Sequence, residues 1–202
     1  NVYNSPTEMG VSKTKTGIVN DEIVREAAKQ EIIRRYFRYK KEELLGLVKK
    51  EVTEKVKKLM QELNINEEYR KTVVPARKAA LDAEKQEDKG NKGFYCGSAM
   101  QFGEKIITGK NSELLHSESA CVINVLKSLS NMPDEIDLLP KNIIQGIREL
   151  KKKIVSSKNP SLDVSEILIA LSISALTNPS AAKCLENISL LKGCEMHTTH
   201  LS

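Results

Sequence analysis

Apolar residues in the first third of the chain recur at the spacing of an α-helix. They come as adjacent pairs repeated every four or five residues: Ile23/Val24, Ala27/Ala28, Ile32/Ile33 and Tyr36/Phe37. This spacing places the pairs on one stripe of a helix. A second stripe runs from Leu44 to Leu63, and Gly46 favours a break between two helices near residues 40–47.

After the polar, glycine-containing run 87–93 the periodicity changes. Residues 94–102 and 105–108, joined by a short turn, predict a β-hairpin. Further helices are expected near Ser117, behind Pro140, after Asp163 and after Pro179, followed by a terminal strand over 195–201. Asp163 can cap its helix, with Glu166 in the reciprocal position of a capping box. The helix at 164–176 is apolar on nearly every side, so we expect it to be almost wholly buried.

These elements predict an α+β fold with three segments. Residues 1–20 form an extended N-terminal arm, residues 21–88 a mainly helical subdomain, and residues 89–202 an α/β subdomain. In the α/β subdomain, helices are packed around the hairpin and the terminal strand. A chain of 202 residues is long enough to bury a core.

The formal charge of +5 is spread along helices that also carry acids, such as Glu31 beside Arg34 and Arg35. Only 4% of the residues are aromatic, too few for base-stacking platforms. This pattern is typical of a solvated, salt-bridged helical face and favours no nucleic-acid partner. The longest apolar run, 167–173, is too short to span a bilayer, so no membrane partner is expected.

The cysteines Cys96, Cys121, Cys184 and Cys194 are widely spaced and form no CxxC pair. Because no signal peptide is present, we expect reduced thiols and a cytoplasmic location. The chain has no initiator methionine and opens within a motif, which indicates a piece of a longer protein.

Chemically versatile side chains gather at the C-terminal end, where residues 194–202 hold two of the three histidines. Strand alternation points Cys194 and His197 to opposite faces but places Glu195 and His197 on the same face. We therefore predict Glu195 and His197 as a catalytic acid–base pair. The alternative is that both serve packing or hydrogen bonding.

A second polar cluster opens the chain, where Asn4, Ser5 and Thr7 stand beside Pro6 and Gly10. Short hydrogen-bonding side chains in such a loop can bind a ligand, or they can cap a turn. We predict that this arm and the C-terminal strand help to form one pocket. The alternative is that each end caps its own local structure.

Lys110 lies in the run 108–112, which resembles a phosphate loop only superficially. Glu104 and Asn111 occupy positions where that loop needs glycine and a hydroxyl residue. Lys110 beside a helix N-terminus is nevertheless a candidate anion-binding residue. A plain turn is the favoured alternative, because Gly109 at a strand end usually supplies a positive φ.

His116, Ser117 and Glu118 match the H-x-E pattern that zinc deaminases place at a helix start after a hairpin. The P-C-x-x-C half of that signature is missing, since Cys184 and Cys194 are not paired. One ligand cannot hold a catalytic zinc ion. The sequence therefore predicts an exposed histidine and no metal, and it identifies no cofactor.

Five blocks carry a resemblance to a known family: YNSPTEMGV (3–11), DEIVREAAKQEIIRRY (21–36), ITGKNSELL (107–115), NP (178–179) and GCEMH (193–197). The chain resembles the C-terminal half of the bacterial family called domain of unknown function eighteen forty-six. This resemblance implies a helical subdomain followed by an α/β subdomain with deaminase-like layering but no zinc signature. It implies no known reaction.

Three functions remain open. The first is a small-molecule pocket shared with the protein's own N-terminal domain, which the resemblance implies is absent here. The second is a complete small-molecule enzyme that uses Glu195 and His197. The third is a helical assembly module without catalysis, in which the stripes over 21–63 pack between protomers, and we expect a homo-oligomer.

Overall fold

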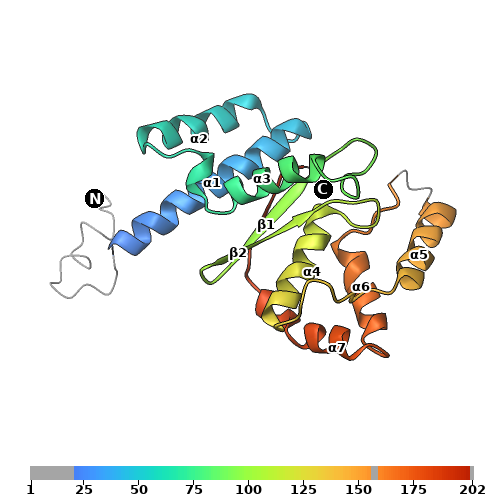
Figure 1. Cartoon of the computed structure of the whole chain (residues 1–202). Coiled ribbons are helices and arrows are strands. Elements are labelled where there is room, and N and C mark those ends of the chain that lie inside the picture. The colour runs from blue at the N-terminus through green and yellow to red at the C-terminus, as the bar shows by residue number, and fades with distance from the viewer. Residues whose placement is uncertain (1–20, 156–158, 201–202) are drawn as a thin grey trace, which may run out of the picture. The chain divides into compact units, whose positions relative to one another are not determined.

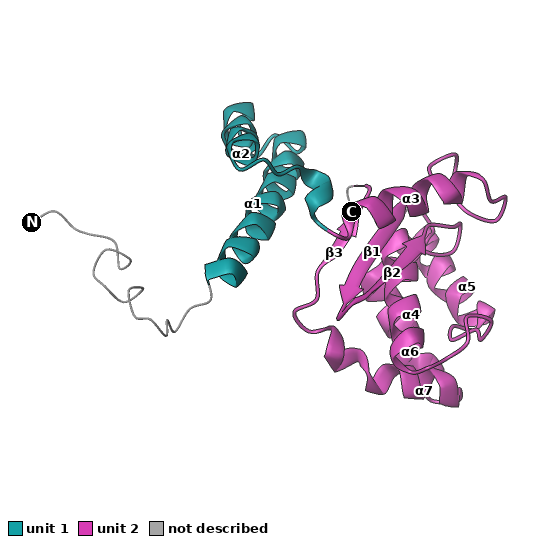
Figure 2. Ribbon diagram, turned by 60° about the vertical axis from the view of Figure 1, so that its left-hand side comes forward, with its two compact units in different colours: residues 1–70 teal, residues 71–202 magenta. Residues whose placement is uncertain are grey.

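The computed structural model describes residues 21–155 and 159–200 (Figure 1). The chain forms two compact units, Asn1–Arg70 and Lys71–Ser202 (Figure 2). Over the described ranges it has seven α-helices and one three-stranded antiparallel sheet, so the predicted α+β class is confirmed. No helix in these ranges combines the length and apolarity needed to cross a membrane.

The first unit is a pair of helices, α1 (Asp21–Leu44) and α2 (Lys50–Glu62), followed by a short 3-10 turn at Glu67–Tyr69. The predicted break between the helices is confirmed, and Gly46 lies there with a φ of +72°. The apolar core of the first unit consists of four buried side chains, those of Ile33, Tyr36, Met60 and Ile65.

The second unit is built on a sheet of order β2-β1-β3, formed by β1 (Gly97–Phe102), β2 (Lys105–Lys110) and β3 (Met196–Thr198). The hairpin and a terminal strand were both predicted. Helix α3 (Val73–Glu84) packs on this sheet, whereas the sequence grouped its residues with the helical subdomain.

Two glycines in the hairpin allow helices to approach opposite faces of the sheet. A Cβ at Gly97 would lie 2.2 Å from the carbonyl oxygen of Ala76 in α3. A Cβ at Gly109 would lie 2.2 Å from the backbone nitrogen of Cys121 in α4 (Ser117–Leu129). Gly109 therefore serves close packing within β2, which corrects the expectation that it supplies a turn with positive φ.

After α4, the chain continues through α5 (Lys141–Leu150), a π-helical turn (Lys151–Val155), α6 (Val164–Ser174), α7 (Pro179–Glu186) and a 3-10 turn (Ile188–Leu191). Asp163 and Glu166 form the predicted capping box at the start of α6. Asn178 caps α7, with Pro179 in its first turn as expected.

The prediction that the helix at 164–176 is almost wholly buried is wrong. One stripe of α6 is buried, formed by Ile167, Ala170, Leu171 and Ser174, while Ile169 is 58% exposed. The helix packs against α4, α5 and α7 through that stripe, so its other apolar residues stay at the surface of the described chain. An all-round apolar pattern shows that a helix can be buried, but not how many neighbours will cover it.

Candidate functional site

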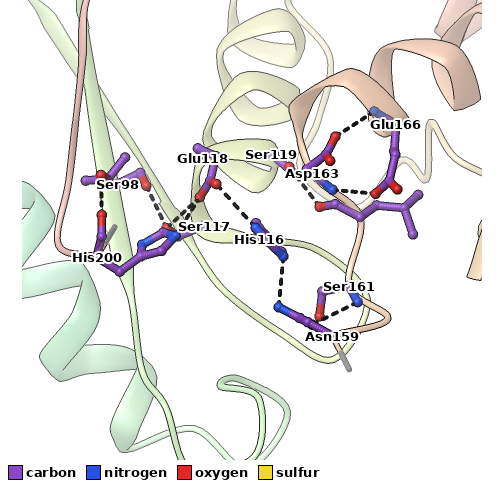
Figure 3. Close-up of polar contacts among 12 residues, drawn as sticks. Ser98, His116, Ser117, Glu118, Ser119, Asn159, Ser161, Asp163, Glu166 and His200 are labelled. Atoms are coloured by element: carbon purple, nitrogen blue, oxygen red, sulfur yellow. Dashed lines mark hydrogen bonds and ion pairs between the residues drawn. The ribbon is translucent and has the colours of Figure 1, made fainter. Parts of the chain in front are cut away.

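The start of α4 is brought beside the C-terminal end of the chain by the sheet register. Thr198 in β3 is paired with Ser98 in β1, and the Ser98 hydroxyl lies 2.7 Å from the Ser117 hydroxyl at the first residue of α4. His200 follows two residues after Thr198. As a result, it reaches the first turn of α4 (Figure 3).

His116, Glu118 and His200 form what we call the histidine–glutamate cluster. His116 Nδ1 lies 3.3 Å from one carboxylate oxygen of Glu118, and His200 Nε2 lies 3.2 Å from the other. The Ser117 hydroxyl donates to the same carboxylate at 3.3 Å. The two imidazoles thus approach Glu118 from two sides, as Figure 3 shows.

Glu118 is a buried carboxylate held in its ionised form. Burial raises the pKa of Glu118, but the hydrogen bonds with His116 and His200 outweigh this and hold it well below its usual range. Its place in the first turn of α4 also favours a negative charge, since the helix N-terminus carries partial positive charge. A buried charge needs such partners to be tolerated.

The segment carrying Asn159 is tied to α4 and orients His116. The backbone N–H of His116 and the Ser119 hydroxyl both donate to the carbonyl of Leu162, at 3.0 and 2.9 Å. The Asn159 amide then lies 3.0 Å from His116 Nε2, and its oxygen accepts from the backbone N–H of Ser161 at 3.1 Å.

These contacts assign the tautomer of His116. A backbone N–H can only donate, so the oxygen of Asn159 faces Ser161 and its NH2 group faces His116. In this arrangement His116 Nε2 accepts, and Nδ1 carries the proton that it donates to Glu118.

A cavity of about 410 Å³ lies against the cluster. His116, Ser117 and His200 line it together with Asn91, Lys92, Phe94, Cys96, Asn111, Ser112, Leu115, Asn159 and Ser161. This volume is typical of pockets for small molecules. The His200 Nδ1 atom is buried and has no hydrogen-bond partner in the described part of the chain.

Cys96 also lines the cavity, but its environment does not activate a nucleophile. Burial raises the pKa of the Cys96 thiol, and the negative charge of Glu118 raises it further. Reactive cysteines instead have lowered pKa values and cationic neighbours. The cluster, rather than Cys96, is therefore the candidate reactive group of this cavity.

The three cluster residues could hold a metal ion, because their ligand atoms all lie within 4.8 Å of one another. Sequence reasoning matched His116 and Glu118 to the H-x-E pattern but set them aside, and it did not place His200 with them, because His200 joins them only through the pairing of β3 with β1. The predicted exposed histidine is wrong, since the His116 side chain is 23% exposed and hydrogen-bonded. The expectation of no metal rested on spacing along the sequence and stays untested.

The predicted acid–base pair lies elsewhere. Glu195 is exposed and precedes β3, while His197 lies within β3 opposite Ala99. Neither lines the cavity at the cluster. Their catalytic role stays a prediction. The other predicted binding residues, Asn4, Ser5 and Thr7, lie outside the described residues, as does the arm that was expected to share their pocket.

Lys110 ends β2 and lines a second cavity, of about 430 Å³. Three other lysines line the same cavity, Lys89, Lys127 and Lys141, together with one acid, Asp137. The excess of positive charge suits an anionic group.

Comparisons with known proteins identify the family. Residues 68–202 match the model described as "Domain of unknown function DUF1846, C-terminal", and residues 1–64 match the one described as "Domain of unknown function DUF1846, N-terminal". The chain belongs to this family. The match over 1–64 corrects two expectations: that the chain resembles only the C-terminal half, and that the N-terminal domain is absent from it.

Relatives called "UPF0371 protein" occur in several clostridial species. The chain is 42% identical to that of Clostridium tetani, 43% to that of Clostridium botulinum strain Kyoto and 40% to that of Clostridioides difficile, each over 198 residues. These matches cover 98% of this chain but 39% of each relative. The chain thus spans well under half the length of these relatives.

Proposed function

We propose that the unit Lys71–Ser202 binds a small polar molecule in the cavity beside the histidine–glutamate cluster and acts on it through that cluster. The observation that carries this proposal is the convergence of two imidazoles on one buried carboxylate at a cavity wall. A pocket of this size with a few convergent polar groups is the usual form of a small-molecule site.

The residues of the cavity support a ligand with both polar and apolar parts. The side-chain amides of Asn91 and Asn111 can hydrogen-bond to the ligand, while Phe94 and Leu115 offer apolar contact. His116 and His200 line the wall where the ligand would lie, and imidazoles backed by a carboxylate can exchange protons with it. The backing carboxylate also fixes the orientation of both rings.

Deaminase-like layering is part of the proposal. The support is local: His116 and Glu118 stand at the start of a helix that follows a hairpin, as in the H-x-E pattern. A similar arrangement of helices and strands does not imply the same reaction. A cytoplasmic location is also proposed, because the four cysteines are free thiols, as in a reducing compartment.

Native mass spectrometry of the chain purified from a bacterial host tests the proposed pocket. We expect the unaltered chain to retain a small molecule and His116→Asn to lose it. His197→Asn removes the one histidine outside the cluster and should retain the molecule. Equal retention by His116→Asn and His197→Asn, in folded protein, would contradict the pocket.

A second candidate function is helical assembly, which the surface of the first unit favours. Large apolar side chains of its helices and loops are exposed, including Ile23 at 67% and Leu47 at 71%. Where such side chains form a contiguous patch, the patch commonly marks an interaction surface. Light scattering should then show a homo-oligomer that Leu47→Glu dissociates, whereas a monomer at all concentrations would dismiss this candidate.

A further inference from the structure

We infer that the histidine–glutamate cluster is a binding site for a divalent transition-metal ion of the zinc class, with His116, Glu118 and His200 as its ligands. The inference rests on the proposed function only for the small molecule on which such an ion would act. The metal site itself is inferred from the geometry of its three residues. The ion would occupy the wall of the 410 Å³ cavity.

The donor set suits this class of ion. Two imidazoles and one carboxylate make up a common ligand set of catalytic zinc sites, which use three protein ligands and leave one position open. Imidazole nitrogen favours zinc, copper, iron and nickel over calcium or magnesium, which take oxygen ligands. The cavity beside the cluster provides room for water or a ligand in the open position.

The spacing of the donors also fits. Two ligands that each lie about 2.0–2.1 Å from zinc, at the tetrahedral angle, are about 3.3–3.4 Å apart. His116 Nδ1 and His200 Nε2 lie 3.3 and 3.2 Å from the oxygens of Glu118, and all three groups fall within 4.8 Å of one another. The two separations from Glu118 therefore already match those around one ion, and the two imidazole ligand atoms lie within 4.8 Å of each other.

The surroundings of the cluster resemble those of a built site. Glu118 is 9% exposed and the imidazoles are 23% exposed, so the donors are shielded while one side meets the cavity. The outer nitrogen of His116 contacts Asn159, in the position where ligating histidines are normally held by a second group. The Nδ1 atom of His200 is buried and has no hydrogen-bond partner within the described ranges, so His200 lacks the corresponding second contact.

Cobalt(II) and zinc added to the chelator-treated full chain test the inference. We expect one cobalt(II) ion to bind with the visible absorption of a four- or five-coordinate site, and zinc to displace it. His116→Asn, His200→Asn and Glu118→Gln should each weaken binding by more than the 10–100-fold that is typical of losing an outer contact. Glu104→Gln, at an exposed carboxylate in the hairpin turn outside the cavity, is the matched control for Glu118→Gln and should keep the wild-type affinity.

Circular dichroism identifies the variants that are folded. The visible absorption of cobalt(II) bound to the wild-type chain tests the site without any variant. Failure of the folded wild-type chain to bind cobalt(II) would overturn the inference. So would a thiolate-to-cobalt absorption band, because it would place Cys96 or Cys194 among the ligands. A chain that binds no metal but retains a small molecule disproves only the metal site, while metal binding without any retained molecule disproves only the proposed function.

Discussion

The two compact units differ in how they use their apolar residues. Over the described residues, the core of Asn1–Arg70 holds four buried apolar side chains, whereas the core cluster of Lys71–Ser202 holds fifteen. Both units also expose large apolar side chains, among them Leu47 at 71% in the first and Leu176 at 83% in the second. A large packed core can hold side chains from distant parts of the sequence in a fixed geometry. The candidate reactive site lies in the unit with the larger core.

The two units also differ in how deeply their paired carboxylates are buried. On α1, Glu31 accepts hydrogen bonds from Arg34 and Arg35, which lower the pKa of Glu31 to about 2; both arginines are exposed and Glu31 is partly exposed. This confirms the predicted salt-bridged helical face. Glu118 is instead buried and paired with two imidazoles beside a cavity. Ion pairs in water are weak, so a buried charge is the stronger sign of function.

The largest expected effect contrasts a core leucine with a surface leucine. Leu171 is fully buried in α6, so Leu171→Ala should lower the free energy of unfolding by ~2–5 kcal/mol through lost burial and a residual cavity. Leu47→Ala, at an exposed position, should change it by less than ~0.5 kcal/mol. Urea unfolding followed by two probes measures both. Similar losses for the two variants would remove the contrast between the units.

A pair of glycine variants tests how α4 is held against the sheet. Gly109→Ala places a Cβ against the backbone of α4 and should destabilise the protein by ~1–3 kcal/mol and weaken metal binding, since the clash moves the helix start. Gly146→Ala meets no atom within 4 Å inside helix α5 and should stabilise by ~0.4–1 kcal/mol. Thermal unfolding of both variants decides; a tolerated Gly109→Ala would show that close contact is not required there.

The outer contact of His116 gives a subtler test. If a metal binds at Nδ1, the imidazole proton moves to Nε2 and needs an acceptor, which the Asn159 amide supplies only by turning over. Asn159→Asp provides that acceptor, so we expect cobalt(II) to bind about tenfold tighter. Asn142→Asp, at an exposed position of α5 that does not line the cavity, is the control and should bind cobalt(II) as before. Weaker binding by Asn159→Asp would count against Nδ1 as the ligand.

The smallest effect is expected on the surface of α1. Glu31→Gln removes the acceptor of two exposed ion pairs, and because water screens such pairs the midpoint of urea unfolding should not move measurably. A clear loss of stability would show that the charges of the first unit matter more than their exposure indicates. Repeating the measurement at high salt, which screens the pairs, checks this.

Much of the local structure followed from the sequence alone. The break near Gly46, the hairpin, the Asp163–Glu166 capping box and the helix start at Pro179 were all predicted. Each depends on contacts among residues a few positions apart, so the local pattern contains the information required.

The candidate site was decided by the tertiary structure. His200 joins His116 and Glu118 because β3 takes the free edge of β1 in a register that pairs Thr198 with Ser98. The one sequence signal for the approach of His200 was the predicted terminal strand, because that strand could pair with the hairpin. Register and strand order depend on packing between segments about a hundred residues apart in the sequence, and a shift of one residue reverses every side chain. Residue identities thus supplied the chemistry of the cluster, while the sheet determined which of them meet.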